Sequence, residues 1–434
     1  MCYAIPGKVK AFDDKFVIVD YFGEERKAYN ELDDLKVGDY IYAQGGYAIK
    51  HILPDEAQSI LSVWKETFFE LQEVDLELSR LDLEKQGIDS RVTSILDRIN
   101  RGIFLRREDA LFLLTLKDER GIEFVLKNAN FLRQQHHKNA CCVHGIIEIS
   151  NSCSKNCLYC GISTHNKSLK RYVMSKNEIF GAAKEAVDKY GFNALVFQSG
   201  EGSDYKIDDL AQVIERIRKE LKALIFISFG EIGIEGLSQL YRAGARGLLL
   251  RFETSNEELY ARLHPGYKLS SRLEQIKKAY EMGYLIATGG LIGLPGQTHQ
   301  DILNDIYLAK ELGTEMYSFG PIIPAPNTPL AKHSLVNQVE VLKAIALMRL
   351  IDPENANVLV TTAFETLSRQ ARRKGLLSGA NSVMLNATPF KYRKLYSIYP
   401  DRAHETEDIG SQIEDTITLL KSLGRAPTDL GVSG

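Results

Sequence analysis

The chain has 434 residues, of which 44% are hydrophobic, and 54 Lys and Arg against 57 Asp and Glu give a net charge of −3. At ~100 to 200 residues per domain, this length allows two to four domains. No basic run follows the pattern of a phosphate-binding surface, so a nucleic-acid partner is not expected. No stretch reaches the ~20 apolar residues that span a bilayer, and no signal peptide is evident, so we expect a cytoplasmic protein without a membrane partner.

The first 90 residues change from a strand pattern to a helix pattern. Residues 3–52 contain short β-prone runs separated by turn residues, which predict a small all-β, barrel-like N-terminal domain at residues 1–55. From Pro54 the apolar spacing predicts one long amphipathic helix ending near Gly87, so residues 56–90 are expected to form a helical linker. Residues 91–143 are expected to be a helical lead-in to the next domain.

Residues 144–430 alternate between apolar strand candidates and amphipathic helical stretches. Strands are expected at 145–150, 194–199, 224–229, 247–252, 284–290, 316–320, 358–363 and 382–386. This repeat predicts an α/β fold of the (β/α)8, or TIM, barrel type, for which ~250 residues are typical. An open doubly wound sheet is the alternative. In the barrel, functional residues follow the C-terminal ends of the strands.

All six cysteines lie in the first 160 residues, at Cys2, Cys141, Cys142, Cys153, Cys157 and Cys160. The last three form a C-x3-C-x2-C pattern after the first barrel strand. Three thiolates bind three irons of a cubane 4Fe-4S cluster, and the fourth iron stays open to an exogenous ligand such as S-adenosylmethionine (SAM). A zinc site completed by His165 is the alternative. Cys141 and Cys142 are expected to be core or reducible surface thiols.

The cysteine motif and several later stretches resemble known proteins. C-x3-C-x-Y-C-G resembles the radical SAM superfamily, whose aromatic residue before the third cysteine, here Tyr159, borders the SAM adenine. VFQSGE, LLLRFETSNEELYARLHPG, GLIGLPGQT and FGPIIPAPNTPL are similar to the HydE-type FeFe-hydrogenase maturases of the biotin synthase-like group. The similarity covers about residues 91 to 430. It implies that Cys153, Cys157 and Cys160 hold the cluster.

The resemblance also implies residues that contact SAM. It places Gln198, Ser199 and Glu201 at the methionyl part, and Glu253 and Arg272 at the charged groups of that part. A carboxylate for the ammonium and a guanidinium for the carboxylate are chemically suitable partners. The alternative is a surface Glu/Arg pair.

Candidate substrate residues come from burial and from the resemblance. Arg251 lies in an apolar strand and is costly to bury unpaired, so we expect it to face an anionic ligand inside the barrel. The resemblance adds the substrate-cavity positions Thr361, Thr362, Met384, Tyr396 and Tyr399. Packing is the alternative role for any of these residues, above all for Met384.

The absence of later cysteines and one glycine-rich stretch limit the cofactors that the chain is expected to bind. No cysteine follows Cys160, and residues 401–415 lack the C-terminal cysteine triplet of some HydE proteins, so a one-cluster enzyme is expected. Gly289, Gly290, Gly293 and Gly296 do not form a P-loop, so they are expected to mark close backbone approach at the barrel top.

The N-terminal stretches MCYAIPGKV and VGDYIYAQGGYAIKHILPDEA resemble the HypC family of NiFe-hydrogenase maturation chaperones over residues 1 to about 80. Removal of Met1 would expose the thiolate and α-amine of Cys2 to a metal. The resemblance implies an iron with cyanide and carbonyl ligands at Cys2, although Gln44 stands where the family has a histidine. The alternative is a recognition module whose Cys2 holds nothing.

Together these features predict a HypC-like module joined to a HydE-like radical SAM barrel. The enzyme is expected to cleave SAM reductively and to direct a 5'-deoxyadenosyl radical at a small sulfur-containing substrate in hydrogenase cofactor maturation. A cysteine-bound iron carbonyl/cyanide complex is one candidate substrate. Expected partners are other maturation proteins and an electron donor, reduced ferredoxin or flavodoxin. The alternatives are an amino-acid rearrangement of the methylornithine synthase type and a non-catalytic iron-fragment chaperone or scaffold.

Overall fold

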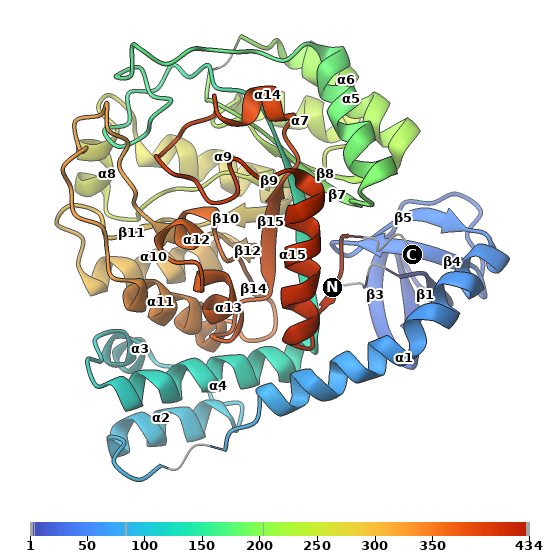
Figure 1. Cartoon of the computed structure of the whole chain (residues 1–434), viewed down its shortest axis with the longest axis horizontal. Coiled ribbons are helices and arrows are strands. Elements are labelled where there is room, and N and C mark those ends of the chain that lie inside the picture. Colours follow the sequence, from blue (N-terminus) through green and yellow to red (C-terminus); the bar gives the residue numbers. More distant parts are fainter. Residues whose placement is uncertain (1–2, 4, 83–84, 203, 431–434) are drawn as a thin grey trace.

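The computed structural model describes residues 3, 5–82, 85–202 and 204–430. A small β-barrel, a helical connector and a large parallel-stranded α/β barrel follow one another along the chain (Figure 1). Within these ranges, no helix combines the length and the apolar character needed to cross a membrane. The predicted (β/α)8 class, with a small β-barrel before it, is confirmed.

The first five strands form the small closed barrel, which we call the front module. They are β1 (Gly7–Asp13), β2 (Phe16–Tyr21), β3 (Glu24–Asn30), β4 (Tyr40–Gln44) and β5 (Tyr47–Ile52), in the order β1-β2-β3-β5-β4. Alternate residues of β2 point inward, so Val17, Val19 and Tyr21 are buried in the module core. Phe68 and Leu71 of the following helix close one side of that core.

The helical connector begins with α1 (Pro54–Leu78). The prediction that this helix continues to near Gly87 is wrong. Leu78 and Leu81 remain 39% and 36% exposed, so a further turn would have no apolar surface to pack on. Asp75 is the last buried residue of α1, and it pairs with Arg133 at 2.7 Å and with Arg425 at 2.9 Å. The lead-in helices are α2 (Ser90–Ile99), α3 (Arg107–Leu114) and α4 (Glu119–His137).

Eight parallel strands form the large barrel. They are β6 (Ala140–Ser150), β7 (Ala194–Ser199), β8 (Leu224–Ser228), β9 (Gly247–Leu249), β10 (Leu285–Thr288), β12 (Thr314–Tyr317), β14 (Asn357–Val358) and β15 (Ser382–Asn386). Their order is β14-β12-β10-β9-β8-β7-β6-β15, and a bridge between Leu359 and Ser382 joins the two ends. Three short strands lie outside this path: β11 (Leu291–Ile292), β13 (Gly320–Pro321) and β16 (Ala426–Pro427).

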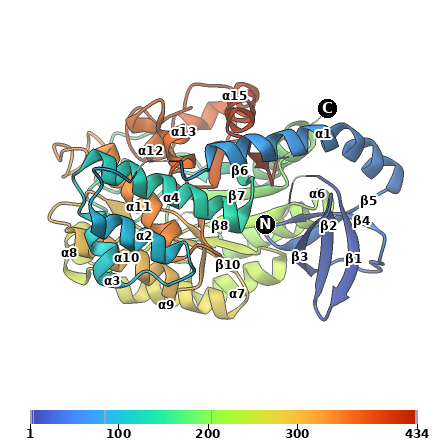
Figure 2. The same cartoon turned by 90° about the horizontal axis from the view of Figure 1, so that it is seen from below.

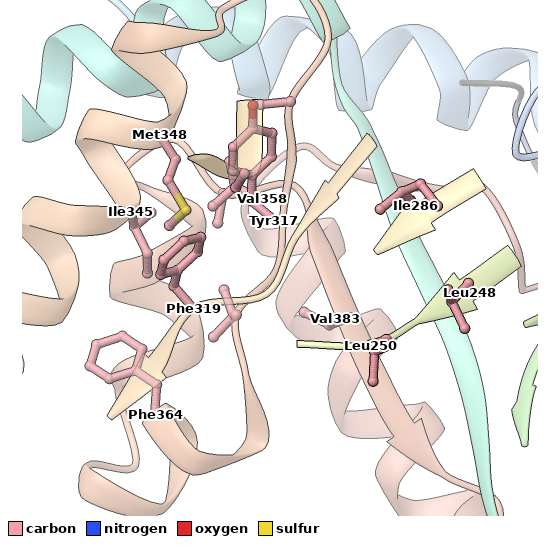
Figure 3. Packing of buried hydrophobic residues seen from close by; sticks show 14 of the residues in the cluster. Leu248, Leu250, Ile286, Tyr317, Phe319, Ile345, Met348, Val358, Phe364 and Val383 are labelled. Atoms are coloured by element: carbon pink, nitrogen blue, oxygen red, sulfur yellow. The ribbon is translucent and has the colours of Figure 1, made fainter. Parts of the chain in front are cut away.

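Helices cover the outside of the barrel. They are α5 (Lys176–Lys184) with the π-turn Glu185–Lys189, α6 (Ile207–Leu221), α7 (Gly233–Ala243), α8 (Glu257–Leu263), α9 (Leu269–Glu281), α10 (His299–Glu311), α11 (Gln338–Ile351), α12 (Thr362–Leu367), α13 (Ala371–Leu376), α14 (Phe390–Arg393) and α15 (Ile409–Ser422). Outward-facing strand residues such as Tyr317 and Val358 pack with Ile345 and Met348 of α11 (Figure 3). Full burial of such a side chain contributes about 1.5–3 kcal/mol.

Inward-facing residues form a separate apolar cluster inside the large barrel. Its members are Cys142, Ala194, Val196, Leu224, Phe226, Leu285, Ala287, Met316 and Leu359, with Tyr47, Ile146, Leu249 and Met384 packed against it. The interior is therefore filled with side chains, and space for a ligand remains near the strand ends.

The front module lies against the large barrel near the N-terminal ends of its strands (Figure 2). Glu31 pairs with Arg218 and Arg246, each at 2.6 Å. The Tyr47 hydroxyl donates to the Gly283 carbonyl at 3.3 Å. A Cβ atom on Gly45, which has φ +52°, would lie 2.7 Å from Leu224 Cδ2, so this turn approaches the barrel interior too closely for a larger residue.

Candidate active site

A cavity of about 290 Å³ lies at the C-terminal ends of the barrel strands. Its wall includes every candidate site residue that the sequence indicated within the described ranges. These residues are Cys153, Cys157, Tyr159, Cys160, Gln198, Ser199, Glu201, Arg251, Glu253, Arg272, Thr361, Thr362, Met384, Tyr396 and Tyr399. Cys2 lies outside the described residues.

The cysteine-bearing loop after β6 has little regular structure and is fixed by its neighbours. The Ser154 N–H donates to the Glu201 carbonyl at 2.9 Å, and the Gly161 N–H donates to Ile398 at 2.8 Å. A Cβ atom on Gly161 would collide with the Ser397 carbonyl oxygen. Arg171 donates to the carbonyls of Asn151 and Ile162, both at 2.6 Å. The loop is therefore held from several sides before any ligand binds.

The three thiols of this loop suit an iron–sulfur cluster. Each side chain is partly buried and faces the same cavity. Burial raises the pKa of all three thiols, that of Cys160 to about 12, so a thiolate here needs a cationic partner such as iron. His165, the ligand that a zinc site would need, is exposed and bonds to the Asn156 carbonyl at 2.9 Å. Three thiols therefore face one cavity, which is the number of protein ligands that a SAM-binding 4Fe-4S cluster requires.

A chain of partly buried charged side chains shares the cavity wall with the thiols or adjoins it. Glu201 pairs with Lys155 at 2.8 Å and with Arg272 at 2.6 Å. Arg272 also pairs with Glu231 at 3.0 Å and donates to the Arg251 carbonyl at 3.1 Å. Burial alone would raise the pKa of Glu201, but Arg272 and Lys155 lower it, so the carboxylate is ionised. Sequence reasoning missed Lys155 and Glu231, because single charged residues carry no signal of their own.

Glu253 and Arg251 form a second charged pair on the same wall, 3.3 Å apart. Glu253 has φ +69°, a left-handed conformation that costs a non-glycine residue about 1–3 kcal/mol. Burial raises the pKa of Glu253, although Arg251 opposes this effect. Neither Glu253 nor Arg272 is a surface residue, so the interpretation as a surface Glu/Arg pair is wrong.

Glycines allow the backbone around Glu253 to close tightly. A Cβ atom on Gly290 would lie 2.5 Å from the Glu253 carbonyl oxygen, and one on Gly289 would collide with the Ser318 carbonyl. Leu291 donates its N–H to the same Glu253 carbonyl at 2.9 Å. At Gly289 and Gly290, close backbone approach at the barrel top agrees with the sequence-based expectation.

Tyr159 is positioned by a histidine that sequence reasoning did not select. The Tyr159 hydroxyl lies 3.0 Å from His264 Nε2, and His264 Nδ1 lies 3.0 Å from the Tyr260 carbonyl. Burial lowers the pKa of His264 to about 4, so the ring is neutral, with Nδ1–H donating and Nε2 accepting. The available signal was the four-residue spacing of Tyr260, on α8, and His264, the residue that follows this helix.

The cavity wall also includes Thr361, Thr362 and Met384. Thr361 is the N-cap residue of α12, and its hydroxyl accepts the Phe364 N–H at 3.3 Å. Met384 touches both the cavity and the interior apolar cluster, so packing and ligand contact are both available to it. Burial raises the pKa of Tyr399 to about 12, so this phenol is protonated.

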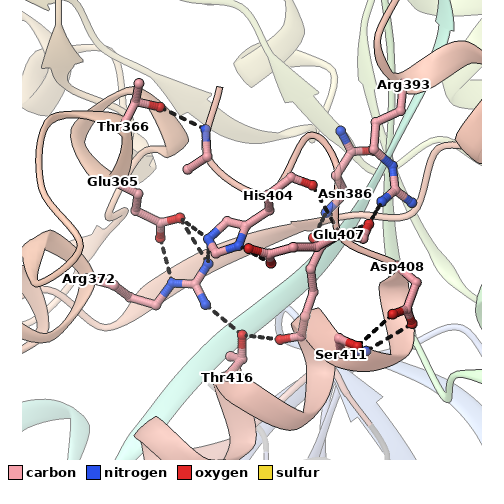
Figure 4. Close-up of polar contacts among 12 residues, drawn as sticks. Glu365, Thr366, Arg372, Asn386, Arg393, His404, Glu407, Asp408, Ser411 and Thr416 are labelled. Carbon is pink, nitrogen blue, oxygen red and sulfur yellow. Dashed lines mark hydrogen bonds and ion pairs between the residues drawn. The ribbon is translucent and has the colours of Figure 1, made fainter. Parts of the chain in front are cut away.

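The segment that carries Tyr396 and Tyr399 is held by a buried polar network (Figure 4). Arg372 donates to Glu365 at 2.6 Å and to Thr416 at 2.6 Å. His404 bridges Glu365 at 3.1 Å and Glu407 at 2.6 Å. Arg402 pairs with Glu148 on β6. The network links the segment to α12, α13 and α15, and nothing in the local sequence pattern indicated it.

Comparison with known proteins identifies the class. Residues 147–309 match the radical SAM superfamily, residues 318–426 match the Biotin and Thiamin Synthesis associated domain, and residues 1–64 match the HupF/HypC family. With the three-thiol cavity at the barrel top, these matches define a radical SAM enzyme that carries a HypC-type module. A 4Fe-4S cluster and SAM are the cofactors that the superfamily implies.

The subunit HydE, an FeFe-hydrogenase maturase of Thermotoga maritima, is 36% identical over 333 residues, which are 77% of this chain and 94% of HydE. The chain therefore belongs to the HydE family of radical SAM hydrogenase maturases. Two solved structures share the fold. Methylornithine synthase (PylB) has a TM-score of 0.67 at 22% identity, covering 77% of this chain and 97% of PylB. The maturase HydG from Carboxydothermus hydrogenoformans also has a TM-score of 0.67, at 20% identity, and the match covers 86% of this chain and 85% of HydG.

Proposed function

We propose that this HydE-family enzyme directs a SAM-derived radical at a small sulfur-containing substrate, a cysteine-bound iron carbonyl/cyanide complex, in hydrogenase cofactor maturation. The observation that carries the proposal is one cavity whose wall combines three thiols with two adjoining sets of polar side chains, which meet at the Arg251–Glu253 pair. The first set lies around Glu201 and Arg272, and the second around Thr361 and Tyr396. Such a division suits one cosubstrate and one substrate held side by side.

The first set is assigned to the cofactors. Cys153, Cys157 and Cys160 would hold the cluster, which when bound and reduced supplies one electron that cleaves SAM to methionine and a 5'-deoxyadenosyl radical. Glu253 offers a carboxylate to the SAM ammonium. Arg272 is held in place by Glu201 and Glu231 and offers its charge to the SAM carboxylate.

Side chains beside these charges complete the SAM site. Gln198 and Ser199, at the end of β7, line the methionyl side of the cavity. Tyr159, fixed by the neutral His264 ring, provides an aromatic face for the adenine.

The second set is assigned to the substrate. Arg251 supplies positive charge for an anionic complex, and its pairing with Glu253 restrains the guanidinium. The hydroxyl groups of Thr361, Thr362 and Tyr399 can donate to carboxylate or cyanide groups. Met384 and Tyr396 add the thioether and the phenol ring to the same part of the cavity wall.

Partners extend this function beyond the barrel. Reduced ferredoxin or flavodoxin would supply the electron, and other hydrogenase maturation proteins would receive the product, in the cytoplasm. We assign Cys2 of the front module to carry an iron fragment with cyanide and carbonyl ligands. Infrared bands of these ligands in protein purified from a hydrogenase-producing host test this assignment. Bands that persist in Cys2→Ala would contradict it.

Product analysis tests the reaction itself. Anaerobically reconstituted protein with SAM and dithionite should release 5'-deoxyadenosine, and the rate should rise at least about tenfold with the cysteine-bound iron complex. Thr361→Val should reduce this stimulation and leave basal SAM cleavage unchanged. Conversion of lysine to methylornithine would replace the proposal with a rearrangement. No 5'-deoxyadenosine from fully loaded protein would indicate a scaffold.

A further inference from the structure

A second group of metal-ligating side chains lies at the N-terminal end of β6. Cys142, His144 and Asp429 each offer one ligand atom, and these atoms all lie within 4.8 Å of one another. All three side chains are buried, with exposures of 5%, 3% and 1%. None of them lines the radical cavity.

The fold explains how residues almost 300 positions apart meet here. Cys142 and His144 are two apart on β6, so strand alternation points both to the barrel interior. The short strand β16 pairs with β6 at Ala140 and Cys141, and this pairing carries Asp429 over the same strand end. His144 Nε2 lies 3.2 Å from Asp429 Oδ2.

This group is separate from the cluster site. Cys142 and Ser150 are eight residues apart on one extended strand, which corresponds to about 26 Å at ~3.3 Å per residue. The cysteine triplet begins beyond Ser150. A metal at Cys142 would therefore be neither part of the 4Fe-4S cluster nor in contact with SAM.

The front module covers this end of the barrel. Tyr47 packs against the interior cluster that contains Cys142, Phe226 and Leu285. Gln44 is the antiparallel partner of Tyr47, and opposite residues project to the same face of a sheet, so Gln44 also faces the barrel. Gln44 is fully buried, and neither its amide oxygen nor its amide nitrogen has a hydrogen-bond partner among the described residues. A buried amide without partners is costly unless a ligand satisfies it.

The charges and donor atoms of Cys142, His144 and Asp429 indicate which metal ion this group would bind. A thiolate and a carboxylate would neutralise a divalent cation, and a neutral imidazole would add a third donor without further charge. A neutral site suits the apolar surroundings of Phe226 and Leu285. Mg²⁺ and Ca²⁺ prefer all-oxygen sites, whereas sulfur, nitrogen and oxygen together suit Zn²⁺.

We propose that Cys142, His144 and Asp429 form a zinc-type metal site sealed between the front module and the N-terminal end of the barrel. The metal would link β6 to the C-terminal segment that carries Asp429. His144 supplies one ring nitrogen, and its Nδ1 has no hydrogen-bond partner among the described residues. The proposal does not depend on the reaction at the opposite end.

The test uses the full chain carrying Cys153→Ser, Cys157→Ser and Cys160→Ser, which removes the cluster ligands. Protein produced with added Zn²⁺ should contain about one zinc per chain by mass spectrometry. Protein produced with added Co²⁺ should show a thiolate-to-cobalt charge-transfer band and strong tetrahedral d–d bands. In this background, Cys142→Ser, His144→Gln and Asp429→Asn should each lower the metal content at least about tenfold.

Cys141→Ser is the matched control, because Cys141 is the adjacent cysteine and packs in the outer core. It should keep the metal, as should Cys2→Ser. Circular dichroism and thermal unfolding identify variants that keep the native fold, and Asp429→Asn is nearly isosteric. Natively folded protein that contains no zinc would overturn the proposal. The three residues would then form no metal site, and His144 and Asp429 would be a buried ion pair. Metal that survives Cys142→Ser but is lost with Cys141→Ser or Cys2→Ser would also overturn it.

Discussion

The two ends of β6 carry thiols in opposite surroundings. Beyond its C-terminal end, Cys153, Cys157 and Cys160 line a cavity together with charged and hydroxyl side chains. At its N-terminal end, Cys142 lies among apolar side chains beneath the front module. The difference follows from the barrel: loops form one end and leave a cavity, whereas packed side chains fill the other end.

The largest expected effect is loss of the 4Fe-4S cluster, which should depend on thiols at the C-terminal end of β6 and not on the thiol at its N-terminal end. Cys157→Ala should abolish the 4Fe-4S cluster and lower 5'-deoxyadenosine production about a thousandfold or more, because the remaining two thiols cannot hold it. Iron analysis and chromatography of the nucleoside measure this loss. Cys142→Ala, at the other end of the strand, should keep the cluster and its absorbance. A cluster that survives Cys157→Ala would disprove the assignment of the ligands.

The second effect is on SAM binding, through the charge of Arg272 at the C-terminal end of the barrel. Arg272→Lys should weaken SAM binding about 10- to 100-fold, because an ammonium cannot span Glu201 and Glu231 as the guanidinium fork does. Equilibrium dialysis against labelled SAM measures the change on reconstituted protein. Arg246→Lys, which alters the pair with Glu31 at the N-terminal end, is the control and should leave SAM affinity unchanged.

A smaller effect is expected where the front module docks. Glu31→Gln should destabilise the contact by about 1–2 kcal/mol, because the paired guanidinium groups of Arg218 and Arg246 lose their counterion. Hydrogen exchange should accelerate in β10, which lies beside this contact at Gly283. SAM cleavage should remain unchanged. Unaltered exchange would show that the contacts of Gly45 and Tyr47 with the barrel interior hold the front module without the Glu31 ion pairs.

The smallest effect concerns the network in Figure 4. Burial alone would lower the pKa of His404, but Glu365 and Glu407 raise it. A histidine whose folded pKa is raised stabilises the fold fully below its unfolded pKa, ~6.5, and loses that contribution as the pH rises through the folded value.

His404→Gln should therefore lower the free energy of unfolding by about 1 kcal/mol near pH 6 and by less near pH 9. Thermal unfolding at the two pH values provides the measurement. His299→Gln, which alters the half-buried pair with Glu340, is the matched control and should lower the free energy of unfolding by less at both pH values. An equal loss at both pH values would mean that His404 acts through packing and not through charge.

Sequence reasoning predicted residues that line one cavity, but it did not predict the residues that hold them in place. The strand-to-loop position of Cys153 and the residues at later strand ends could be predicted, because parallel strands end on one face of a barrel. His264, Lys155 and Glu231 were missed, since each acts through a side chain distant in the sequence. The end of α1 was also missed, because only the exposed Leu78 and Leu81 show that no surface is available to extend the helix.

The sequence by itself determined the eightfold strand–helix alternation, the three-thiol loop and the β-barrel character of the front module. These features depend on periodicity and on spacing within a few residues. Only the tertiary structure decided that the front module covers the barrel end opposite the thiol loop, and that Asp429 meets Cys142 and His144. The reason is physical: pairing of β16 with β6 and burial of Tyr47 are long-range contacts, which local patterns do not encode.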